Sequence, residues 1–374
     1  MTPYRCWVEV SRARIAANFR AVREAVGSDV EVMAVVKADA YRHGALEVAR
    51  VLEAEGAHWL AVSNVEEGVA LRGAGIQARI LVMADFLASE RAALAEYNLT
   101  PVIHALGDLE DWNTLAGRLE QWLPYHLKID SGMGRLGTRA EAGEIAAAVT
   151  AQRGIQLEGL MTHFASAADY AGAQTTDQIE HFERLRAELA GMGIRPRYVH
   201  MASSTPVAYG RREAWGNMVR PGHAIYGYVS PPRGHAPESV LRVEPALSWK
   251  TQVLAVKDVP SGAPIGYGAM FRAPRPMRIA VLAAGYADGI PHRLSNRGRA
   301  IAKGKVVPFL GAVSMDLTTI DVTECADLQV GDTVTLLGQE GDASIDAQQI
   351  ARIAGTISYS VLCGISARVK RVYV

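Results

Sequence analysis

The chain has 374 residues, of which 49% are hydrophobic and 21% charged, and this predicts a globular protein with two domains or a barrel with an appendage. Its 39 Lys and Arg residues balance 39 Asp and Glu residues, which is not the charge pattern of proteins that bind nucleic acid or anionic membranes. We therefore expect a small-molecule partner.

Cysteine usage and the absence of long apolar segments restrict the protein class further. Cys6, Cys325 and Cys363 are widely spaced, which argues against a disulfide framework or a cysteine zinc site. No H-E-x-x-H motif or Cys/His cluster occurs, so we expect no metal. Residues 1–14 contain charges and no long apolar segment, and no apolar stretch of about 18 residues follows. These features predict a cytoplasmic protein that neither spans nor binds a membrane.

Between about residues 30 and 230, short apolar segments alternate with Ala-, Glu- and Arg-rich segments of helical period. This alternation predicts repeated βα units, and eight of them in series predict a (β/α)8 TIM barrel. The expected strands are Val32–Lys37, Trp59–Val62, Ile80–Met83, Pro101–His104, Tyr125–Ile129, Leu157–Met161, Tyr198–Met201 and Met218–Arg220.

After residue 240 the pattern becomes β-rich with Gly and Pro turns, and only Asp346–Ala354 has a helical pattern. We therefore expect a barrel over residues 11–235 and a mainly β domain over residues 236–374. The early strand Cys6–Val10 precedes the barrel, so residues 1–10 are expected to join the β domain. The strands expected in this domain are Trp249–Val259, Ile279–Ala284, Val306–Phe309, Leu317–Val322 and Thr333–Leu337.

The first candidate site residue is Lys37, which follows an apolar strand and precedes a turn that contains Gly44. Barrel folds place reactive groups at the carboxyl ends of their strands. A partly desolvated lysine there can lose its proton and form a Schiff base with a carbonyl compound. Alternatively, its ammonium group reaches solvent at the mouth of the barrel. Lys37 alone leaves both interpretations open.

The ends of later strands also carry polar side chains. Hydroxyl groups and a glycine turn at strands seven and eight predict a phosphate site. Arg220 could then face a ring nitrogen, with His163 near it. The segments concerned are residues 128–137, 162–166, 202–204 and 219–222.

Taken together, the chain resembles alanine racemase over nearly its whole length. The segments that carry the resemblance follow the family's order. They are VKADAYRHG at 36–44, KIDSGMGRLG at 128–137, VRPG at 219–222 with YG at 226–227, GYG at 266–268, GYADG at 285–289 and MD at 315–316. The family has a TIM barrel, a C-terminal β domain and pyridoxal 5'-phosphate (PLP) as cofactor.

The resemblance assigns the cofactor site residue by residue. It implies that Lys37 holds PLP covalently and later acts as one of two acid/base groups. Arg135 would bind the cofactor's phenolic oxygen and the substrate carboxylate, and Lys128, a carbamylation candidate, would orient it. Arg220 would face the pyridine nitrogen with His163 beside it, and it cannot leave its proton on the ring because a guanidinium is effectively never deprotonated. The implied phosphate ligands are Tyr41, Ser204, Gly222, His223 and Tyr359.

Racemisation removes a proton from one face of the α-carbon and returns it to the other, so a second base must lie opposite Lys37. The resemblance assigns this role to Tyr267, contributed by the partner subunit of a homodimer. Met315 and Asp316, also from the partner, would complete the carboxylate pocket, and Tyr286 would narrow the entrance. The implied activity is interconversion of L-alanine and D-alanine, which provides a peptidoglycan precursor. Tyr267 alone could instead be a turn residue between two glycines.

Some positions depart from the family pattern, and two other functions compete. Ser203 replaces an asparagine, Ala312 an arginine, residues 290–293 the usual Tyr-Pro-Arg, and Ser360 a glutamate. A wider entrance would make this a racemase of broader specificity that also accepts serine, lysine or arginine.

A PLP-binding carrier or regulatory protein is a second alternative, but that family lacks the β domain and a counterpart of Tyr267. PLP decarboxylases use a Cys-Asp motif that neither Cys325 nor Cys363 matches.

Overall fold

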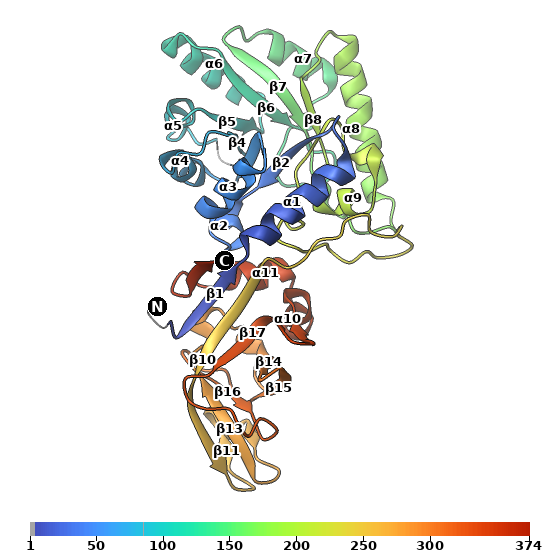
Figure 1. Cartoon of the computed structure of the whole chain (residues 1–374). Coiled ribbons are helices and arrows are strands. Elements are labelled where there is room, and N and C mark those ends of the chain that lie inside the picture. Colours follow the sequence, from blue (N-terminus) through green and yellow to red (C-terminus); the bar gives the residue numbers. More distant parts are fainter. Residues whose placement is uncertain (1–3, 85) are drawn as a thin grey trace. The chain divides into compact units, whose positions relative to one another are not determined.

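The computed structural model describes residues 4–84 and 86–374. It divides into two compact units (Figure 1). The barrel unit comprises residues 14–40 and 45–244, and the C-terminal unit comprises residues 1–13, 41–44 and 245–374.

The barrel unit is built around an eight-stranded parallel sheet with the order β8-β7-β6-β5-β4-β3-β2-β9. Strand β9 pairs with β2, and the N–H of Asn217, just before β9, donates to the carbonyl of Val199 in β8 at 3.1 Å, so the sheet is nearly closed. The eight predicted strands and the TIM barrel are confirmed. The strands are β2 Glu31–Val35, β3 Trp59–Val62, β4 Arg79–Val82, β5 Leu99–Ile103, β6 Leu123–Lys128, β7 Ile155–Met161, β8 Tyr198–His200 and β9 Met218–Val219.

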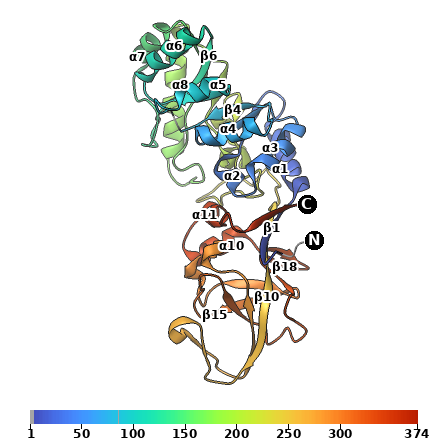
Figure 2. The same ribbon diagram turned by 90° about the vertical axis from the view of Figure 1, so that its left-hand side faces the viewer.

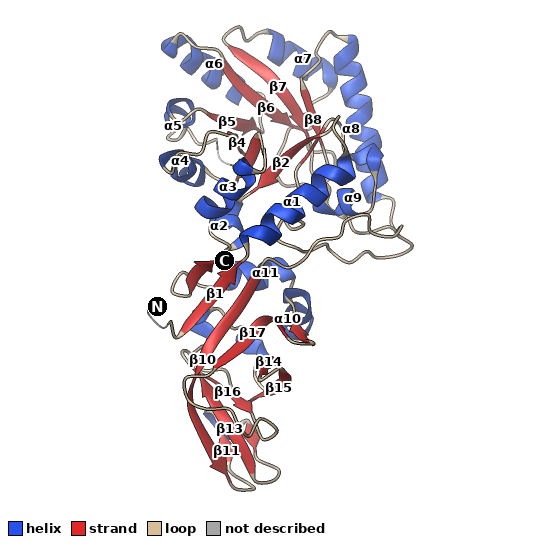
Figure 3. Cartoon of the chain, viewed as in Figure 1, coloured by secondary structure: helices blue, strands red, loops and turns tan. Residues whose placement is uncertain are grey.

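The sequence explains why these segments form a barrel with helices around it. Every residue of β3 and β5 is buried, as expected where both faces of a parallel sheet are covered. Helix α4 begins where the Asn64 side chain accepts a hydrogen bond from the N–H of Glu67. Figure 3 shows the helices in blue around the red strands. The helices of this part are α1 Arg12–Val26, α3 Ala45–Ala54, α4 Val65–Gly73, α5 Arg91–Glu96, α6 Asp108–Leu119, α7 Ala142–Thr150, α8 Gln174–Gly191 and α9 Ser204–Ala208.

An unusual turn follows β2. Segment α2, Lys37–Tyr41, is not a right-handed helix, because Ala38, Asp39 and Ala40 have φ values of 54°, 55° and 52°. The positive φ values continue through Arg42, so the residues after Lys37 form a left-handed turn without glycine. Each such residue costs roughly 1–2 kcal/mol relative to right-handed backbone. Strain of this kind concentrates at functional sites.

The C-terminal unit contains a nine-stranded sheet with the order β18-β17-β14-β15-β16-β13-β10-β1-β19 (Figure 2). Strand β1 lies antiparallel to β10 and parallel to β19, so the prediction that Cys6–Val10 pairs with the β domain is confirmed. The strands are β1 Cys6–Val10, β10 Leu247–Val259, β13 Met277–Leu282, β14 Arg299–Ala302, β15 Lys305–Leu310, β16 Thr318–Asp321, β17 Thr333–Glu340, β18 Ala343–Ile345 and β19 Lys370–Tyr373, with the separate hairpin β11 Pro264–Ile265 and β12 Phe271–Arg272.

The expectation that only Asp346–Ala354 is helical in this unit was wrong. The predicted helix is present as α10, Ala347–Ala354, and Asp346 caps it by accepting from the N–H of Gln349. A second helix, α11, spans Ser358–Gly364, although its Tyr, Val and Cys residues have only modest helix propensity. Packing rather than propensity therefore determines α11: it buries Val361 and Leu362 and contacts α10. Within residues 4–84 and 86–374, no helix combines the length and the apolar character needed to cross a membrane.

Candidate active site

Lys37 lies at the carboxyl end of β2, at the start of the left-handed turn. Two carboxylates hold this turn in place. The N–H of Ala38 donates to Glu67 Oε1 at 2.6 Å, and the N–H of Ala45 donates to Asp39 Oδ1 at 2.8 Å. Hydrogen bonds to ionised acceptors are the stronger kind, so the backbone beside Lys37 is fixed before any ligand binds.

Four cations from the sequence-predicted set come together in the barrel unit. Lys128 ends β6, and burial, followed by the nearby charges of Arg135 and Arg220, lowers its pKa to about 8. Lys37 acts on Lys128 in the same direction, and Asp130 in the opposite one. Mutual repulsion of this kind favours a site for an anionic ligand.

Asp130 offsets the charge of this cluster only in part, and the hydrogen bonds of its carboxylate go to other partners. Its Oδ1 accepts from the backbone N–H groups of residues 132–134 at 3.2, 2.9 and 2.9 Å, and its Oδ2 accepts from Arg139 Nε at 2.8 Å. Burial would raise the pKa of Asp130, but these donors outweigh it and lower the pKa to about 2. The carboxylate therefore shapes the loop that carries Arg135.

Arg220, which follows β9, is buried and makes several hydrogen bonds. One terminal nitrogen donates to His200 Nδ1 and to the His200 carbonyl, both at 2.8 Å. The other donates to the carbonyls of Thr162 and Met201 at 2.7 and 3.0 Å and contacts His163 Nδ1 at 3.3 Å. Burial lowers the pKa of Arg220 to about 9, so the guanidinium remains charged at neutral pH.

His163 lies beside Arg220, as the sequence predicted. Burial, followed by the charges of Arg220, Lys128 and Arg135, lowers its pKa to about 3. The imidazole is therefore neutral at physiological pH. It adds a flat, uncharged ring to the cation cluster and no further positive charge.

A second group of donors surrounds Ser204 at the start of α9. Its buried Oγ accepts from the backbone N–H groups of Gly222 and Ala224, both at 3.0 Å, and His223 lies between these two residues. Because the hydroxyl accepts twice, its hydrogen remains available to donate to a ligand. A hydroxyl beside a turn of main-chain amides is a typical phosphate-binding arrangement.

The remaining predicted residues belong to the C-terminal unit. The rings of Tyr41 and Tyr359 pack at a centroid distance of 6.0 Å. Burial raises the pKa of Tyr41, so its hydroxyl keeps its proton. Tyr267 is 75% exposed in a turn whose neighbours Gly266 and Gly268 have φ values of 74° and 64°, where glycine avoids strain. The exposed phenol of Tyr267 is therefore accessible to groups outside its own unit.

The loops that carry Tyr286 and Met315 are joined to each other. The N–H of Tyr286 donates to the carbonyl of Ser314, and the N–H of Ala287 donates to the carbonyl of Met315, both at 2.9 Å. Tyr286 and Met315 are nevertheless 44% and 54% exposed. The two predicted substrate-pocket residues therefore lie on one rigid, exposed part of the unit.

An ion cluster fixes the same loops and engages Asp316, another predicted substrate residue. Asp288 is almost fully buried and accepts two bonds from Arg368, at 2.7 and 2.9 Å, and two from Arg5, at 3.1 and 3.4 Å. Arg368 also donates to Asp316 at 2.7 Å. The Asp316 carboxylate is thus held within its own unit, which the sequence did not indicate.

Comparison with known proteins identifies the family. The family models described as the alanine racemase N-terminal and C-terminal domains match residues 10–231 and 246–373. The chain belongs to the alanine racemase family. The alanine racemase of Halothermothrix orenii is 39% identical over 368 residues, which cover 98% of this chain and 96% of that protein. Members of the alanine racemase family are isomerases, and so is this chain.

Solved structures of the alanine racemase family agree with this fold. The Streptomyces lavendulae enzyme is 31% identical with a TM-score of 0.92, and the match covers 100% of this chain and 98% of that one. The alanine racemase of Bartonella henselae, described with covalently bound pyridoxal phosphate, is 28% identical with a TM-score of 0.88 and full coverage of both chains. The family is PLP-dependent.

Sequence reasoning missed three buried polar residues of the barrel. The predicted site does not include His126, His200 or Glu158, yet all three are connected to Arg220. Strand periodicity offered one signal, because alternation places His126 on the same face of β6 as Lys128. A glutamate within the apolar end of β7 was a second signal.

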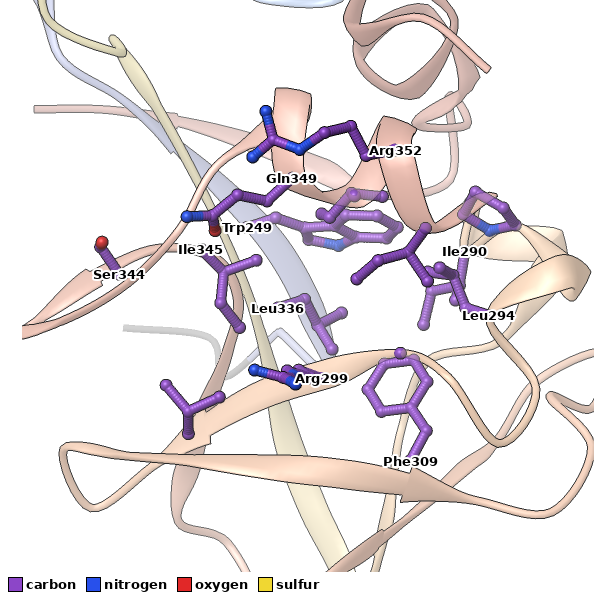
Figure 4. Close-up of a pocket in the computed structure, with 15 residues that line it drawn as sticks. Trp249, Ile290, Leu294, Arg299, Phe309, Leu336, Ser344, Ile345, Gln349 and Arg352 are labelled. Carbon is purple, nitrogen blue, oxygen red and sulfur yellow. The ribbon is translucent and has the colours of Figure 1, made fainter. Parts of the chain in front are cut away.

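The C-terminal unit also contains an apolar cavity of about 380 Å³ (Figure 4). Its walls include the labelled side chains Trp249, Leu294, Phe309, Leu336 and Ile345. None of the predicted cofactor, substrate or catalytic residues lines it. Ile290 and Pro291 of the substituted segment 290–293 are part of its lining, but no predicted site residue is, and we assign the cavity no part in the reaction.

Proposed function

We propose that this member of the alanine racemase family interconverts L-alanine and D-alanine with PLP as cofactor and with two bases on opposite faces of the substrate. Lys37 is one base, and Tyr267 of the partner subunit is the other. The observation that carries the proposal is the cluster of Lys37, Lys128, Arg135 and Arg220 beside the Ser204 donors, because it fits a ligand with several anionic groups.

The donor set fits PLP group by group. Ser204, Gly222 and His223 would bind the phosphate, and the family resemblance adds Tyr41 and Tyr359 as phosphate ligands. Arg135 would bind the phenolic oxygen, with Lys128 orienting it as a carbamate. When bound, PLP supplies an electron sink that stabilises negative charge at the α-carbon of the substrate.

The residues of this chain would then move one proton. The Lys37 amine removes or returns it on one face, and the phenol of Tyr267 of the partner subunit acts on the other face. Arg135, with Met315 and Asp316 of the partner subunit, would hold the substrate carboxylate. Arg220 would face the pyridine nitrogen and keep its proton, while the neutral His163 beside it is a poor proton donor. A ring that stays unprotonated is a weaker electron sink, which disfavours transamination.

The same architecture supports a homodimer, since Tyr267, Tyr286 and Met315 are all exposed on the C-terminal unit. Three free cysteines are consistent with a reducing compartment, and we propose the cytoplasm. The C-terminal unit with Tyr267 argues against a carrier protein, which would need only the barrel.

A racemase of broader specificity is the second candidate. At the substituted entrance segment, His292 packs against Tyr286 with ring centroids 6.2 Å apart, and the buried Ala312 adds no charge where the family has an arginine. The missing arginine removes bulk and charge from the entrance, which favours acceptance of larger substrates. A hydrophobic pocket discriminates by only about 1–3 kcal/mol per methylene, so the breadth has to be measured.

Proton NMR in deuterated water tests the proposal. The full-length protein with added PLP receives L-alanine, L-serine, L-lysine or L-arginine separately, and the chirality of each product is analysed. Deuteration at the α-carbon and formation of the D-enantiomer with alanine alone support a dedicated alanine racemase. Turnover of several substrates supports the broader enzyme. No exchange with any of them, although PLP is bound, would contradict racemase activity and favour the carrier protein.

A further inference from the structure

A continuous line of polar side chains crosses the barrel unit from Arg220. Arg220 contacts His200 Nδ1 at 2.8 Å, and His200 Nε2 contacts His126 Nδ1 at 2.8 Å. His126 Nε2 lies 3.8 Å from Glu158 Oε2, and the two Glu158 oxygens accept from Arg79 at 2.6 Å each. The line thus begins at a buried cation and ends at a half-exposed ion pair.

Packing holds the two imidazoles in place. His126 and His200 are both fully buried, and Trp59 packs against His126 with ring centroids 5.5 Å apart. Gly159 of β7 makes room for His126, because a Cβ atom there would lie 2.4 Å from His126 Nδ1. The register of β6 against β7 also shifts at His126. The backbone of two strands is therefore adapted to this ring.

Hydrogen-bond chemistry fixes where the protons lie. A guanidinium has only donors, so His200 Nδ1 must accept from Arg220 and the proton of His200 is on Nε2. That proton is donated to His126 Nδ1, which places the His126 proton on Nε2, facing the Glu158 carboxylate. One pair of tautomers satisfies both hydrogen bonds and leaves the His126 Nε2 proton facing the carboxylate across 3.8 Å, which is an electrostatic contact and not a hydrogen bond.

Electrostatics support neutral rings with an ionised glutamate. Burial lowers the pKa of both His126 and His200, and the charge of Arg220 lowers them further. Burial would raise the pKa of Glu158, but the nearby His126 and the two bonds from Arg79 lower it to about 2. The line therefore holds two neutral imidazoles between the ionised carboxylate of Glu158 and the guanidinium of Arg220.

We infer that Glu158 acts through His126 and His200 as a positioning residue for Arg220. The carboxylate favours the Nε2–H tautomer of His126. This reinforces the His200 tautomer that Arg220 requires, in which the Nδ1 lone pair is free to accept from Arg220. Arg220 is then held in one orientation. The consequence for catalysis rests on the proposed function, in which Arg220 faces the cofactor ring, whereas the tautomers do not depend on it.

Nitrogen NMR of the full-length protein with ¹⁵N-labelled histidine tests the tautomers, with and without added PLP. His126→Gln assigns the signals. We expect His126 and His200 each to carry a proton on Nε2 and none on Nδ1. A proton on Nδ1 of His200 in the unmodified protein would overturn the inference. Because this measurement needs neither cofactor nor turnover, its failure is distinct from failure of the proposed function.

Glu158→Gln tests the role of the carboxylate. A glutamine amide can rotate to donate to His126 Nε2, which moves the His126 proton to Nδ1 and the His200 proton to Nδ1. That second pair of tautomers cannot accept from Arg220, so we expect a mixture in which part of the population has lost the His200–Arg220 bond. In the PLP-loaded protein kcat for alanine should fall on the order of tenfold while KM stays within about twofold, as is typical when a supporting hydrogen bond to a site residue is lost.

Two further variants separate positioning from simple stability. Arg79→Gln removes the outer cation and should lower the melting temperature while the tautomers stay unchanged, because Glu158 is still ionised. Glu188→Gln, on the exposed face of α8, should change neither the spectrum nor kcat. Unchanged histidine signals in Glu158→Gln, with a melting temperature as low as that of Arg79→Gln, would show a purely structural role and overturn the inference.

Discussion

Lys128 shows how the barrel changes the chemistry of a single side chain. Its amine is buried at the end of β6 among Arg135, Arg220 and Lys37, and its pKa falls to about 8. A free amine is therefore available near neutral pH, and this is the form that reacts with carbon dioxide. The same shift explains why carbamylation at this position would be favourable, since it would replace one cation of the cluster by an anion.

The depressed pKa of Lys128 predicts a dependence of stability on pH. Between about pH 8 and 10.5 the unfolded chain binds more protons at this lysine than the folded chain, so stability rises with pH. Urea unfolding of the protein without cofactor should therefore show the wild type gaining free energy relative to Lys128→Met across this window. Lys257→Met, at an exposed lysine, is the control and should show no such gain. Parallel pH profiles of wild type and Lys128→Met would contradict the prediction.

The sequence singled out candidate site residues where a strand end coincided with a family motif. Lys37, Arg135 and Arg220 were singled out in this way, and the structure brings these three cations together. His200 and His126 were not singled out, because a histidine within a strand shows its importance only through what it contacts across the barrel. Such contacts depend on the register between strands, including the shift at His126, and no local pattern encodes that register.

At the scale of elements, the left-handed turn after β2 is the least predictable feature. Residues 38–42 are Ala, Asp, Ala, Tyr and Arg, and none of them favours positive φ as glycine does. Tertiary contacts must impose the conformation, and the bonds to Glu67 and Asp39 are among them. The turn is strained backbone directly beside Lys37, which agrees with a role in directing its side chain.

Replacing a strained alanine by glycine tests the strain. Ala38→Gly should raise the free energy of unfolding by about 0.5–1 kcal/mol, because relief of left-handed strain exceeds the added entropy of the unfolded chain. Ala187→Gly, at an exposed position of the right-handed helix α8, should lower it by about 1 kcal/mol. The two free energies come from urea titrations. A loss of stability in both variants would mean that the turn is not strained.

The barrel strands were predictable because each is a short apolar segment between helical ones, and Trp59–Val62 was located to the residue. The C-terminal unit was harder. Strands of two to four residues, such as β12 and β14, carry too little pattern, and α11 forms because of its packing. Long-range pairing of β1 with β10 was predictable only because Cys6–Val10 had no place in the βα series.

The ion cluster around Asp288 predicts that the loop of Asp288 and the segments that carry Arg5 and Arg368 stabilise one another. Asp288→Asn removes the charge that holds Arg5 and Arg368 and places an amide donor against a guanidinium. Because both arginines are half-exposed, we expect a loss of about 2–3 kcal/mol, somewhat less than for a fully buried pair. Thermal and urea unfolding measure it, with the exposed Asp342→Asn as control. A loss no larger than in the control would exclude the coupling.

At the scale of the whole molecule, the residues proposed for catalysis divide between two units. Lys37 belongs to the barrel unit, whereas Tyr267 and Met315 are exposed on the C-terminal unit. A tyrosine that is 75% exposed has little to stabilise it unless another surface covers it. A second copy of the chain is the partner that the proposed function requires. In a closed dimer each subunit would then complete the site of the other.

Complementation between two inactive variants tests this central claim most directly. Lys37→Ala and Tyr267→Phe are each expected to racemise alanine poorly as homodimers. If the sites are shared, subunit exchange between them restores one intact site in each mixed dimer, because Lys37 comes from one chain and Tyr267 from the other. Racemase activity should then rise to about a quarter of that of the wild type after random mixing. Mixed dimers, confirmed by native mass spectrometry, that remain as inactive as their parents would contradict a shared site.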